Sequence, residues 1–532
     1  MRYLLHLSIT EAAERDPGHE AIRFAADSLS YGELERRANG LARLLVDRGV
    51  RRGHRVGIYA EKCLELPVAM YGIMKAGAAY VPLDPSAPAA RLRRIVADCE
   101  IEVVISRETK RRALAAWLAG ADPVRACVGI APGNDVGAEC VPWSEISPAD
   151  AAPSVGTIEQ DLAYVLYTSG STAEPKGIMH THRSALCFAE VAASTYGFSS
   201  RDRLSNHAPL QFDLSTLDYF AAAVCGATTV IIPEAYTRVP ASLSQLMETE
   251  RLTTLYAVPL AMIQLTLHGA LEKRDLSALR WVLFGGEPFP TKHLRHMMRL
   301  LPHARFSNVY GPTEVNGCTY HLVPPLPEGS DDPIPIGSVY PNVEALVVDA
   351  DDAIILDDRP GELLIRSGTR MAGYWRRPEM TQRATYRRTA PGGGEDLFHR
   401  TGDLVNRRPD GSFAFLGRKD RQIKTRGHRV ELDEIEVALL GHPRVEEAAA
   451  YAIPDDEGSQ RILACVQLAA PATAPADVEA ELEAHLRGEL PPYAIPAEIK
   501  VLESLPRTPN GKIDRRQLQE QALAASDRAG IR

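Results

Sequence analysis

Much of the chain alternates short, β-rich apolar runs with amphipathic helical patterns, and this alternation limits the folds open to it. The runs start at Arg55, Glu102, Thr228, Thr253 and Arg280, with helical periodicity in the intervals between them. Strands separated by helices form parallel sheets with helices on their faces, because a parallel connection needs a long crossover. The pattern therefore predicts an α/β architecture.

The pattern changes after Ile336 and again near Asp420. From Ile336 the strands are shorter and separated by turns, including the hairpin-like segment RRPDGSFAFLG, which favours a mixed or antiparallel sheet. Beyond Asp420 the sequence is typical of an independent α+β unit that reaches residue 515, and residues 516–532 are typical of a fraying helical tail. We therefore predict a core domain over 1–419 and a small C-terminal domain over 420–515.

Charge and cysteine content indicate an ordinary protein of a reducing compartment. Lys and Arg number 60 and Asp and Glu 69, and the formal net charge of −9 gives no general attraction to nucleic acid or anionic membranes. The 8 cysteines lack CxxC spacing, the N-terminus lacks a signal-peptide pattern, and no apolar run approaches the ~20 residues of a membrane span. We expect a cytoplasmic protein with no nucleic-acid or membrane partner.

A loop rich in hydroxyls and glycine, YTSGSTAEPKG from Tyr167 to Gly177, follows the apolar run LAYVL. Glycine lets a backbone approach an anion closely, hydroxyls add hydrogen-bond donors, and Lys176 adds positive charge. The GxxxxGK[ST] spacing of the common P-loop is absent. Taken alone, the segment is compatible with a phosphate-binding loop or with a Ser/Gly surface turn.

Ten motifs in a fixed order decide between these interpretations. They are LSYGEL, MKAGAAYVPLD, the YTSGSTAEPKG loop, FDLS, NVYGPTE, GELLIRSGTRMAGYW, HRTGDL, GRKDRQIKTRGHRVELDEIE, LPPYAIP and NGKIDR. The ordered set resembles the adenylate-forming superfamily, and specifically the adenylation domains of nonribosomal peptide synthetases, over nearly the whole chain. The resemblance implies a large α/β domain with two sheet subdomains and a distorted, barrel-like β subdomain, followed by a small mobile α+β domain.

The resemblance also implies an enzyme that activates a carboxylate with ATP and Mg²⁺. The implied ATP-binding residues are Thr168, Ser169, Gly170, Ser171, Thr172, Lys176, Gly286, Glu287, Asn308, Tyr310, Asp403 and Arg418, and the implied catalytic residues are Thr313, Glu314 and Lys512. Glu314 would help to hold the metal and Asp403 the ribose hydroxyls. Lys512 would lie between the substrate carboxylate and the α-phosphate, where an ammonium group lowers the charge repulsion of the transition state.

Lys512 belongs to the predicted small domain and the phosphate loop to the predicted large one, so the active site must be assembled by domain motion. By resemblance, Asp420 is the hinge between an adenylating and a thioester-forming orientation. In the second orientation, the segment around Gly427 would line the path of a thiol cofactor arm.

Asp213 matches the family residue that pairs with the α-amino group of an amino acid substrate, and this argues against an aryl or fatty acid. A buried carboxylate needs a cationic partner, which such a substrate provides. The implied substrate-binding residues are Phe212, Asp213, Leu214, Leu217, Tyr256, Leu283, Gly285, Val309, Gly317 and Cys318. Their apolar character resembles that of freestanding prolyl adenylation enzymes and disfavours acidic, basic and amide side chains.

The chain departs from the family pattern at two places. Gly285 and Gly317 stand where larger residues are usual, so we expect extra space, and a substituted proline, pipecolate or a small aliphatic amino acid stays an alternative to L-proline. Ala173 and Glu174 stand where the phosphate loop usually carries glycine, which keeps open a degenerate scaffold without activity. An acyl- or aryl-CoA ligase is a further alternative, since such enzymes share the phosphate chemistry.

Few residues follow NGKIDR, and no serine motif for a phosphopantetheine arm accompanies them. We therefore expect the enzyme to load a separate peptidyl carrier protein. Carrier proteins of this kind are usually acidic, and basic side chains next to the hinge are candidates to meet the carrier or its arm. These side chains are Arg421, Lys424, Arg426 and Arg429.

Overall fold

The computed structural model describes residues 2–120, 123–170, 174–455, 459–470, 475–508 and 512–528. The chain divides into two compact units. The larger comprises Met1–Pro85, Val96–Tyr167 and Gly177–Lys419, and the smaller comprises Ser86–Ile95, Thr168–Lys176 and Asp420–Arg532. Among the helices of the described residues, none is long and apolar enough to cross a bilayer.

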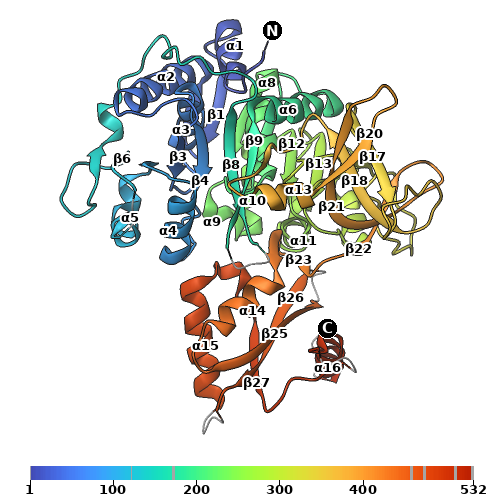
Figure 1. Ribbon diagram of the computed structural model, residues 1–532. Coiled ribbons are helices and arrows are strands. Elements are labelled where there is room, and N and C mark those ends of the chain that lie inside the picture. Colours follow the sequence, from blue (N-terminus) through green and yellow to red (C-terminus); the bar gives the residue numbers. More distant parts are fainter. Residues whose placement is uncertain are drawn as a thin grey trace. The chain divides into compact units, whose positions relative to one another are not determined.

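Two sheets with parallel strands at their centres form the framework of the larger unit (Figure 1). The first has nine strands in the order β16-β15-β14-β13-β12-β10-β11-β1-β2. Its strands are β1 Glu20–Phe24, β2 Asp27–Ser30, β10 Arg203–Asn206, β11 Thr228–Ile231, β12 Thr254–Ala257, β13 Trp281–Gly285, β14 Arg305–Tyr310, β15 Thr319–Leu322 and β16 Ser338–Val339.

The second sheet has eight strands in the order β19-β9-β8-β4-β3-β5-β6-β7. Its strands are β3 Arg55–Ile58, β4 Ala79–Pro82, β5 Val103–Ile105, β6 Ala126–Val128, β7 Glu139–Val141, β8 Leu162–Thr168, β9 Lys176–Thr181 and β19 Gly373–Tyr374. All five apolar runs predicted as strands are strands in these two sheets. The expectation of two α/β sheet subdomains is therefore confirmed.

Helices pack against both sheets, as the alternating sequence pattern predicts. The helices of the larger unit are α1 Leu7–Arg15, α2 Tyr31–Asp47, α3 Glu65–Lys75, α5 Arg111–Leu118, α6 His182–Tyr196, α7 Leu214–Thr216, α8 Ala222–Cys225, α9 Glu234–Thr237, α10 Pro240–Thr249, α11 Pro259–His268, α12 Thr291–Leu300 and α13 Pro378–Arg383. A π-helical turn, Leu217–Ala221, joins α7 to α8, and α4 Ala89–Asp98 spans the division between the units. Short 3-10 turns lie at Glu108–Lys110, Trp143–Glu145, Leu271–Lys273 and Pro492–Ala494.

Local sequence explains where key helices begin. The Ser30 hydroxyl of LSYGEL accepts the backbone N–H of Glu33, and the Glu33 carboxylate accepts that of Ser30, a capping box that starts α2. Thr181 and Ser184 form the equivalent reciprocal pair at the start of α6. Part of the buried face of α6 belongs to the same hydrophobic cluster as several of the predicted substrate residues.

The third sheet of the larger unit is antiparallel, as the shorter strands after Ile336 predict. Its order is β17-β18-β21-β20, with β22 paired to β21. The strands are β17 Val343–Val348, β18 Gly361–Ser367, β20 Thr385–Thr389, β21 Glu395–Arg407 and β22 Phe413–Arg418. Over the described residues this order is open, so the barrel-like subdomain expected here is a five-stranded sheet without closure.

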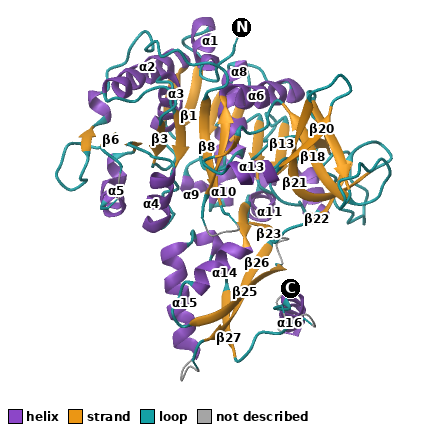
Figure 2. Ribbon diagram, viewed as in Figure 1, coloured by secondary structure: helices purple, strands orange, loops and turns teal. Residues whose placement is uncertain are grey.

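The smaller unit is an α+β unit, as predicted from the sequence beyond Asp420. Its strands are β23 Gln422–Thr425, β24 His428–Glu431, β25 Val445–Pro454, β26 Gln460–Leu468 and β27 Glu498–Leu502, and its helices are α14 Leu432–Leu440, α15 Pro475–Glu489 and α16 Arg515–Arg528. Helix α14 packs on β25, and Figure 2 shows α14 and α15 beside the three-stranded sheet β25-β26-β27.

Helix α16 is not the fraying tail that residues 516–532 suggested. Leu518 is 2% exposed and Ala522 8%, and both belong to a buried cluster with Leu505 and Tyr451. The helix therefore packs on the small sheet. Residues 529–532 of the predicted tail lie outside the described residues.

Candidate active site

Asp403, the predicted ribose ligand, is a buried carboxylate held by two donors. It lies on β21 directly opposite Arg418 on β22, and an Arg418 guanidinium N–H donates to its Oδ1 over 2.5 Å. The Tyr310 hydroxyl donates to its other oxygen. Burial, reinforced by the charge of Asp403, raises the pKa of Tyr310 well above its usual value, so the phenol keeps its proton. The three predicted residues thus form one preorganised group on the larger unit.

Asn308 lies beside Tyr310 on β14 and is buried. Its side-chain NH₂ donates to the carbonyl of Pro335 over 2.9 Å, so part of the amide predicted to meet adenine is used within the protein. Gly286 has a φ of +95°, a conformation that favours glycine, and Glu287 after it is half-buried.

Glu314, the predicted metal ligand, is 1% exposed, and its Oε1 accepts a hydrogen bond of 2.8 Å from the Tyr374 hydroxyl. The backbone of the adjacent Thr313 is also fixed, because His180 Nε2 donates to its carbonyl over 2.8 Å. Burial lowers the pKa of His180 to about 4, so the ring is neutral at physiological pH. Sequence reasoning missed His180 and Tyr374 as supports, although Tyr374 lies within the GYW motif.

Four of the predicted substrate residues meet in one hydrophobic cluster of the larger unit: Leu217, Tyr256, Leu283 and Val309 are all buried in it. Leu214 packs against its margin. Phe212 is half-buried, and Cys318 belongs to a neighbouring cluster that includes Tyr310. The predicted apolar lining is therefore brought together by α7, the π-helical turn after it, and strands β12, β13 and β14.

Asp213 occupies the N-cap position of α7 but makes no side-chain capping bond. The Asp213 side chain therefore does not cap α7, which is the ordinary structural role of an aspartate before a helix. The Asp213 carboxylate is close enough to raise the pKa values of Tyr164 and Tyr256, although burial is the larger cause for both phenols. The next residue, Leu214, packs against the apolar cluster that contains Tyr256.

A second buried carboxylate, Asp218, lies on the π-helical turn and was not singled out from the sequence. It is fully buried, and its Oδ2 accepts from the Asn206 amide over 3.1 Å. The Lys62 ammonium nearby donates to the carbonyls of Asn206 and His207 over 3.1 and 2.5 Å. Burial lowers the pKa of Lys62 to about 8. This polar network holds the C-terminal end of β10, which precedes the segment that contains Asp213.

The extra space expected at Gly285 and Gly317 is absent next to their backbones. A Cβ at Gly285 would lie 2.3 Å from the carbonyl oxygen of Val309, its partner on the adjacent parallel strand. A Cβ at Gly317 would lie 2.6 Å from Cε2 of Phe188. Real Cβ atoms do not approach so closely. The expectation is corrected because side-chain size alone says nothing of how near the neighbouring backbone or ring lies.

The phosphate-loop candidate runs between two strands, β8 and β9. Of its predicted ligands, Ser171 and Thr172 lie outside the described residues. The Ser169 hydroxyl donates to the carbonyl of Arg429 over 2.8 Å, and Lys176 lies 3.6 Å from the Glu431 carboxylate. These bonds explain why residues 168–176 group with the smaller unit, and not with the larger one as the sequence suggested.

The first and last predicted phosphate ligands of the loop lie at the ends of strands. Thr168 ends β8, and Lys176 begins β9 with its side chain 11% exposed. At Gly170 a Cβ would lie 2.3 Å from the carbonyl oxygen of Glu174, so the two sides of the loop approach closely at that glycine.

Lys512, the predicted catalytic lysine, is exposed on the smaller unit. Its backbone carbonyl accepts from the Thr508 N–H over 2.7 Å and from the Thr508 hydroxyl over 3.2 Å. The Asp514 N–H donates to the carbonyl of Pro506, and α16 begins at Arg515. The backbone around Lys512 is thus fixed on both sides, while its side chain faces solvent.

A carboxylate on α14, Glu436, joins the segment after the hinge to the segment after Lys512. Arg421 and Arg515 each donate two hydrogen bonds to it, at 2.7 to 3.0 Å and 2.7 to 2.8 Å respectively, and the Ala450 N–H donates a further one at 2.8 Å. Burial raises the pKa of Glu436, but these bonds outweigh it and leave the pKa below the usual value. Arg421 also pairs with Asp433, and its contact with a carrier protein stays a prediction.

Asp420, the predicted hinge, is exposed and is the first residue of the smaller unit after Lys419. The hairpin that follows turns at Arg426 and Gly427, with φ values of +52° and +79°. Two consecutive residues of positive φ are the requirement of a tight type I′ hairpin, whose twist matches that of the strands. Of the four predicted basic side chains, Arg426 is exposed at this turn, and Lys424 and Arg429 are half-buried.

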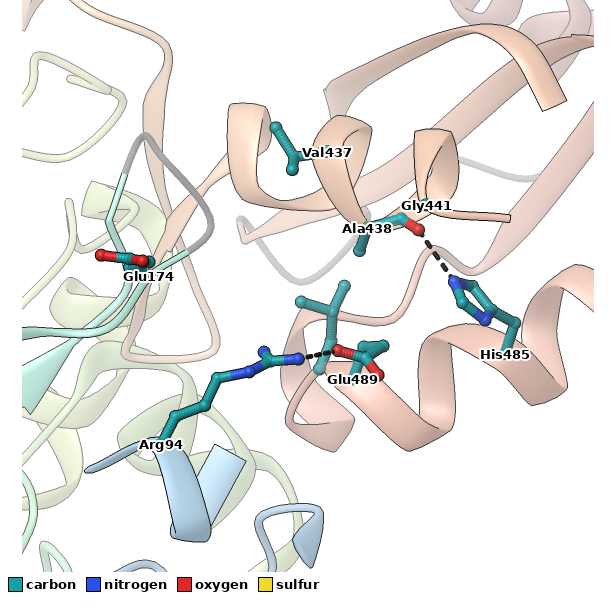
Figure 3. A pocket seen from close by; sticks show the side chains of 8 residues that line it. Arg94, Glu174, Val437, Ala438, Gly441, His485 and Glu489 are labelled. Atoms are coloured by element: carbon teal, nitrogen blue, oxygen red, sulfur yellow. Dashed lines mark hydrogen bonds and ion pairs between the residues drawn. The ribbon is translucent and has the colours of Figure 1, made fainter. Parts of the chain in front are cut away.

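A pocket of about 390 Å³ lies within the smaller unit, lined by Arg94, Glu174, Val437, Ala438, Gly441, His485, Glu489 and Leu490. Figure 3 shows Arg94 pointing toward Glu489, with which it forms an ion pair, and His485 hydrogen bonded to the carbonyl of Ala438. Arg94, Glu489 and His485 are thus engaged with other residues of the pocket wall. Glu174, which departs from the family pattern, contributes to its wall.

Comparison with known proteins decides the family. Residues 9–375 match the AMP-binding enzyme family, and residues 434–512 match the AMP-binding enzyme C-terminal domain. The chain belongs to the AMP-binding enzymes. The resemblance inferred from the ten ordered motifs is therefore confirmed, together with the class of enzyme that it implied.

Two curated relatives align with this AMP-binding enzyme over nearly their whole lengths. The first is an L-proline--[L-prolyl-carrier protein] ligase of Pseudomonas fluorescens, 34% identical over 525 residues, which covers 97% of this chain and 99% of the relative. The second has the same name in Streptomyces coelicolor and is 36% identical over 507 residues, covering 93% of this chain and 92% of the relative.

Solved structures confirm the fold of this AMP-binding enzyme. IdnL1 is 29% identical with a TM-score of 0.77, covering 95% of this chain and 99% of that one. The amide bond synthetase McbA from Marinactinospora thermotolerans has a TM-score of 0.85 at 24% identity, covering 97% of this chain and 99% of that one.

Proposed function

We propose that this AMP-binding enzyme activates L-proline with ATP to prolyl-AMP, with release of pyrophosphate, and then transfers the prolyl group to the phosphopantetheine thiol of a separate peptidyl carrier protein. Two relatives named as ligases of this type, aligned from end to end, support the proposal. The observation that carries it on the chain itself is the apolar cluster of Leu217, Tyr256, Leu283 and Val309, against which Leu214, the residue after Asp213, packs.

The proposed substrate site uses each of these features. Asp213 would pair with the secondary ammonium of proline, which orients the carboxylate end toward the nucleotide. The apolar side chains would contact the ring, whose CH₂ groups need no hydrogen-bond partner. A charged or amide side chain in that cluster would lose its hydration without a partner, so polar amino acids are excluded.

The proposed nucleotide site uses the Asp403 group. A carboxylate held by Arg418 and Tyr310 is oriented, and it would accept hydrogen bonds from the ribose hydroxyls. The face of Tyr310 would lie against adenine and the Asn308 amide at its polar edge. Thr168, Ser169, Gly170, Lys176 and the remaining loop hydroxyls would surround the β- and γ-phosphates.

Glu314 fits the Mg²⁺ that the family implies. Mg²⁺ is commonly bound through one or two carboxylates together with substrate phosphates and waters, and a buried carboxylate next to Thr313 provides the protein share of such a set. When bound, the ion would neutralise charge on the phosphate oxygens. Tyr374 would hold the Glu314 carboxylate in one orientation, and His180 the Thr313 backbone next to the α-phosphate.

The reaction runs in two steps. In the first, a carboxylate oxygen of proline attacks the α-phosphorus of ATP, and the bond from that phosphorus to the β-phosphate oxygen breaks, so that pyrophosphate leaves. The Lys512 ammonium would stabilise the charge shared by these oxygens. In the second, the carrier thiolate attacks the acyl carbon, and AMP leaves with the former carboxylate oxygen.

The two steps require different arrangements of the chain, with a core domain over 1–419 and a mobile domain over 420–515. Asp420 would be the hinge, and α16 would complete the mobile domain. Of the basic side chains near the hinge, Arg426 at the exposed hairpin turn, with Lys424 and Arg429, would meet an acidic carrier or its thiol arm near Gly427.

Amino-acid-dependent exchange of radioactive pyrophosphate into ATP tests the first step. The panel holds L-proline, 4-methylproline, L-pipecolate, L-valine and L-alanine, and L-proline is expected to give the highest kcat/KM. Lys512→Ala should lower the exchange rate by at least about 100-fold, because it removes transition-state charge stabilisation worth about 3 kcal/mol or more. Preference for L-valine by more than about tenfold would refute the prolyl assignment.

The second step is tested by comparing acceptors. A phosphopantetheinylated carrier protein should become prolylated, as detected by intact-protein mass spectrometry, while free coenzyme A should not. A prolyl-CoA product formed faster than prolyl-carrier would identify a coenzyme A ligase instead.

A further inference from the structure

An aromatic ring from a distant part of the chain lies next to Gly317, where a side chain at that position would be. A Cβ at Gly317 would lie 2.6 Å from Cε2 and 3.2 Å from Cζ of Phe188, and 3.3 Å from Cγ1 of Val309. Phe188 is 3% exposed, and it lies on α6. The ring therefore occupies the space that a larger side chain at 317 would take.

Phe188 belongs to the same hydrophobic cluster as Leu217, Tyr256, Leu283 and Val309, the apolar residues of the proposed proline site. Helix α6 also packs against the π-helical turn that carries Leu217. The ring thus approaches this cluster from the side of α6, while the motif-matched residues approach it from the strand ends and from the helix after Asp213. No motif of the sequence marks Phe188.

We propose that Phe188 is a specificity-determining residue of the substrate site, one that limits the size of the ring or substituent that fits beside Gly317. This rests on the proposed function. In place of a large residue at 317, the chain uses glycine there and supplies the bulk from α6. Because a buried aromatic ring packed in a cluster has few alternative positions, it sets a firm wall against one extra methylene or methyl group.

The size of the effect follows from packing. Leucine is smaller than phenylalanine, and the change opens space for about one methylene. Discrimination by one methylene in an apolar pocket is worth about 1–3 kcal/mol, or roughly 10- to 200-fold in kcat/KM. Phe188→Leu should therefore raise the ratio of kcat/KM for L-pipecolate to that for L-proline by at least about tenfold.

Three variants and one control test the proposal by pyrophosphate exchange and thermal unfolding of the full chain. They are Phe188→Leu, Gly317→Ala, the double variant, and Phe198→Leu as a matched control from the same cluster but outside the proposed lining. Gly317→Ala alone should lower both Tm and activity, because its Cβ meets the ring. In the double variant, the alanine methyl regains room, so Tm should rise relative to Gly317→Ala and the pipecolate-to-proline ratio should return to within about threefold of wild type.

Phe198→Leu should lower Tm without changing the ratio. If Phe188→Leu leaves the ratio within about twofold of wild type, or shifts it no more than Phe198→Leu does, Phe188 is a packing residue only and the proposal is wrong. A wild-type enzyme that shows no proline-dependent exchange would refute the proposed function instead. If another amino acid is then the substrate, the same variants are compared with it and its homologue one methylene longer.

Discussion

Replacing Glu436 with glutamine tests whether this carboxylate holds the smaller unit together. The variant keeps the shape of the side chain, but its NH₂ group cannot accept a hydrogen bond, so the two guanidinium bonds that Arg421 and Arg515 donate to one carboxylate oxygen are lost. A hydrogen bond to a charged group contributes about 1.5–3 kcal/mol, so the two together account for about 3–6 kcal/mol. The side chains of Arg421 and Arg515 are 30% and 33% exposed, and solvent screening reduces the total. We expect a destabilisation of about 2–3 kcal/mol.

Hydrogen exchange read by mass spectrometry measures this locally. The four tryptophans, at 117, 143, 281 and 375, all lie in the larger unit, so their fluorescence reports little on the smaller one. Peptides from α14 and β25 should exchange about 30- to 150-fold faster in Glu436→Gln, since each 1.4 kcal/mol is a factor of ten in the opening equilibrium. Peptides from β12 and β13 should not change.

The control is Glu483→Gln on α15, which breaks an exposed i,i+4 pair with Arg487. Such pairs contribute at most about 0.5 kcal/mol, so its exchange should rise less than about threefold. Acid gives a second check. The folded-state pKa of Glu436 lies below the usual value, so its stabilisation is full above the unfolded pKa of about 4.3 and is lost as pH falls through the folded pKa. Equal exchange in the two variants at pH 7 would refute the reasoning.

Three further predictions concern the larger unit. Tyr310→Phe removes one donor to the Asp403 carboxylate, worth about 1.5–3 kcal/mol, and should raise the KM for ATP by at least about tenfold with kcat unchanged in steady-state assays. An unchanged KM would contradict this role of Tyr310. Gly285→Ala places a Cβ 2.3 Å from the Val309 carbonyl and should cost about 1–3 kcal/mol in denaturant unfolding, whereas an unshifted midpoint would show that the strands separate easily. The folded-state pKa of His180 is about 4, so as the pH falls the unfolded chain binds a proton before the folded chain does, and the free energy of unfolding should decrease between pH 6.5 and 4. His180→Asn should make this decrease about 3 kcal/mol smaller. A variant with the same dependence of stability on pH as the wild type would argue against this role of His180.

Sequence periodicity predicted the framework well, because each strand and helix is determined by residues close in the chain. The run at Trp281 is a fully buried parallel strand and reads as a continuous apolar segment. The pairing of Asp403 with Arg418 could also be predicted from the sequence, because both residues belong to recognised motifs. The structure places them opposite each other on neighbouring strands.

The missed features share one physical origin, contact between residues far apart in sequence. Glu436 and Arg515 are 79 positions apart, and neither charge differs in the sequence from an ordinary surface residue. Phe188 is one of many apolar residues on the buried face of α6. The expectation of room at Gly285 failed because it considered the absent side chain and not the carbonyl of the neighbouring strand.

The packing of α16 has a consequence for where this polypeptide can be shortened. A version truncated after Asp514 would retain Lys512 in its sequence, but it would lack Arg515 and would leave Leu505 and Tyr451 without Leu518 as a neighbour. Lys512 would then lie close to a chain end that is held only by the residues preceding it. The final helix is therefore the outer support of the lysine-bearing segment, and mapping activity against successive C-terminal deletions should show a sharp loss once Leu518 is removed.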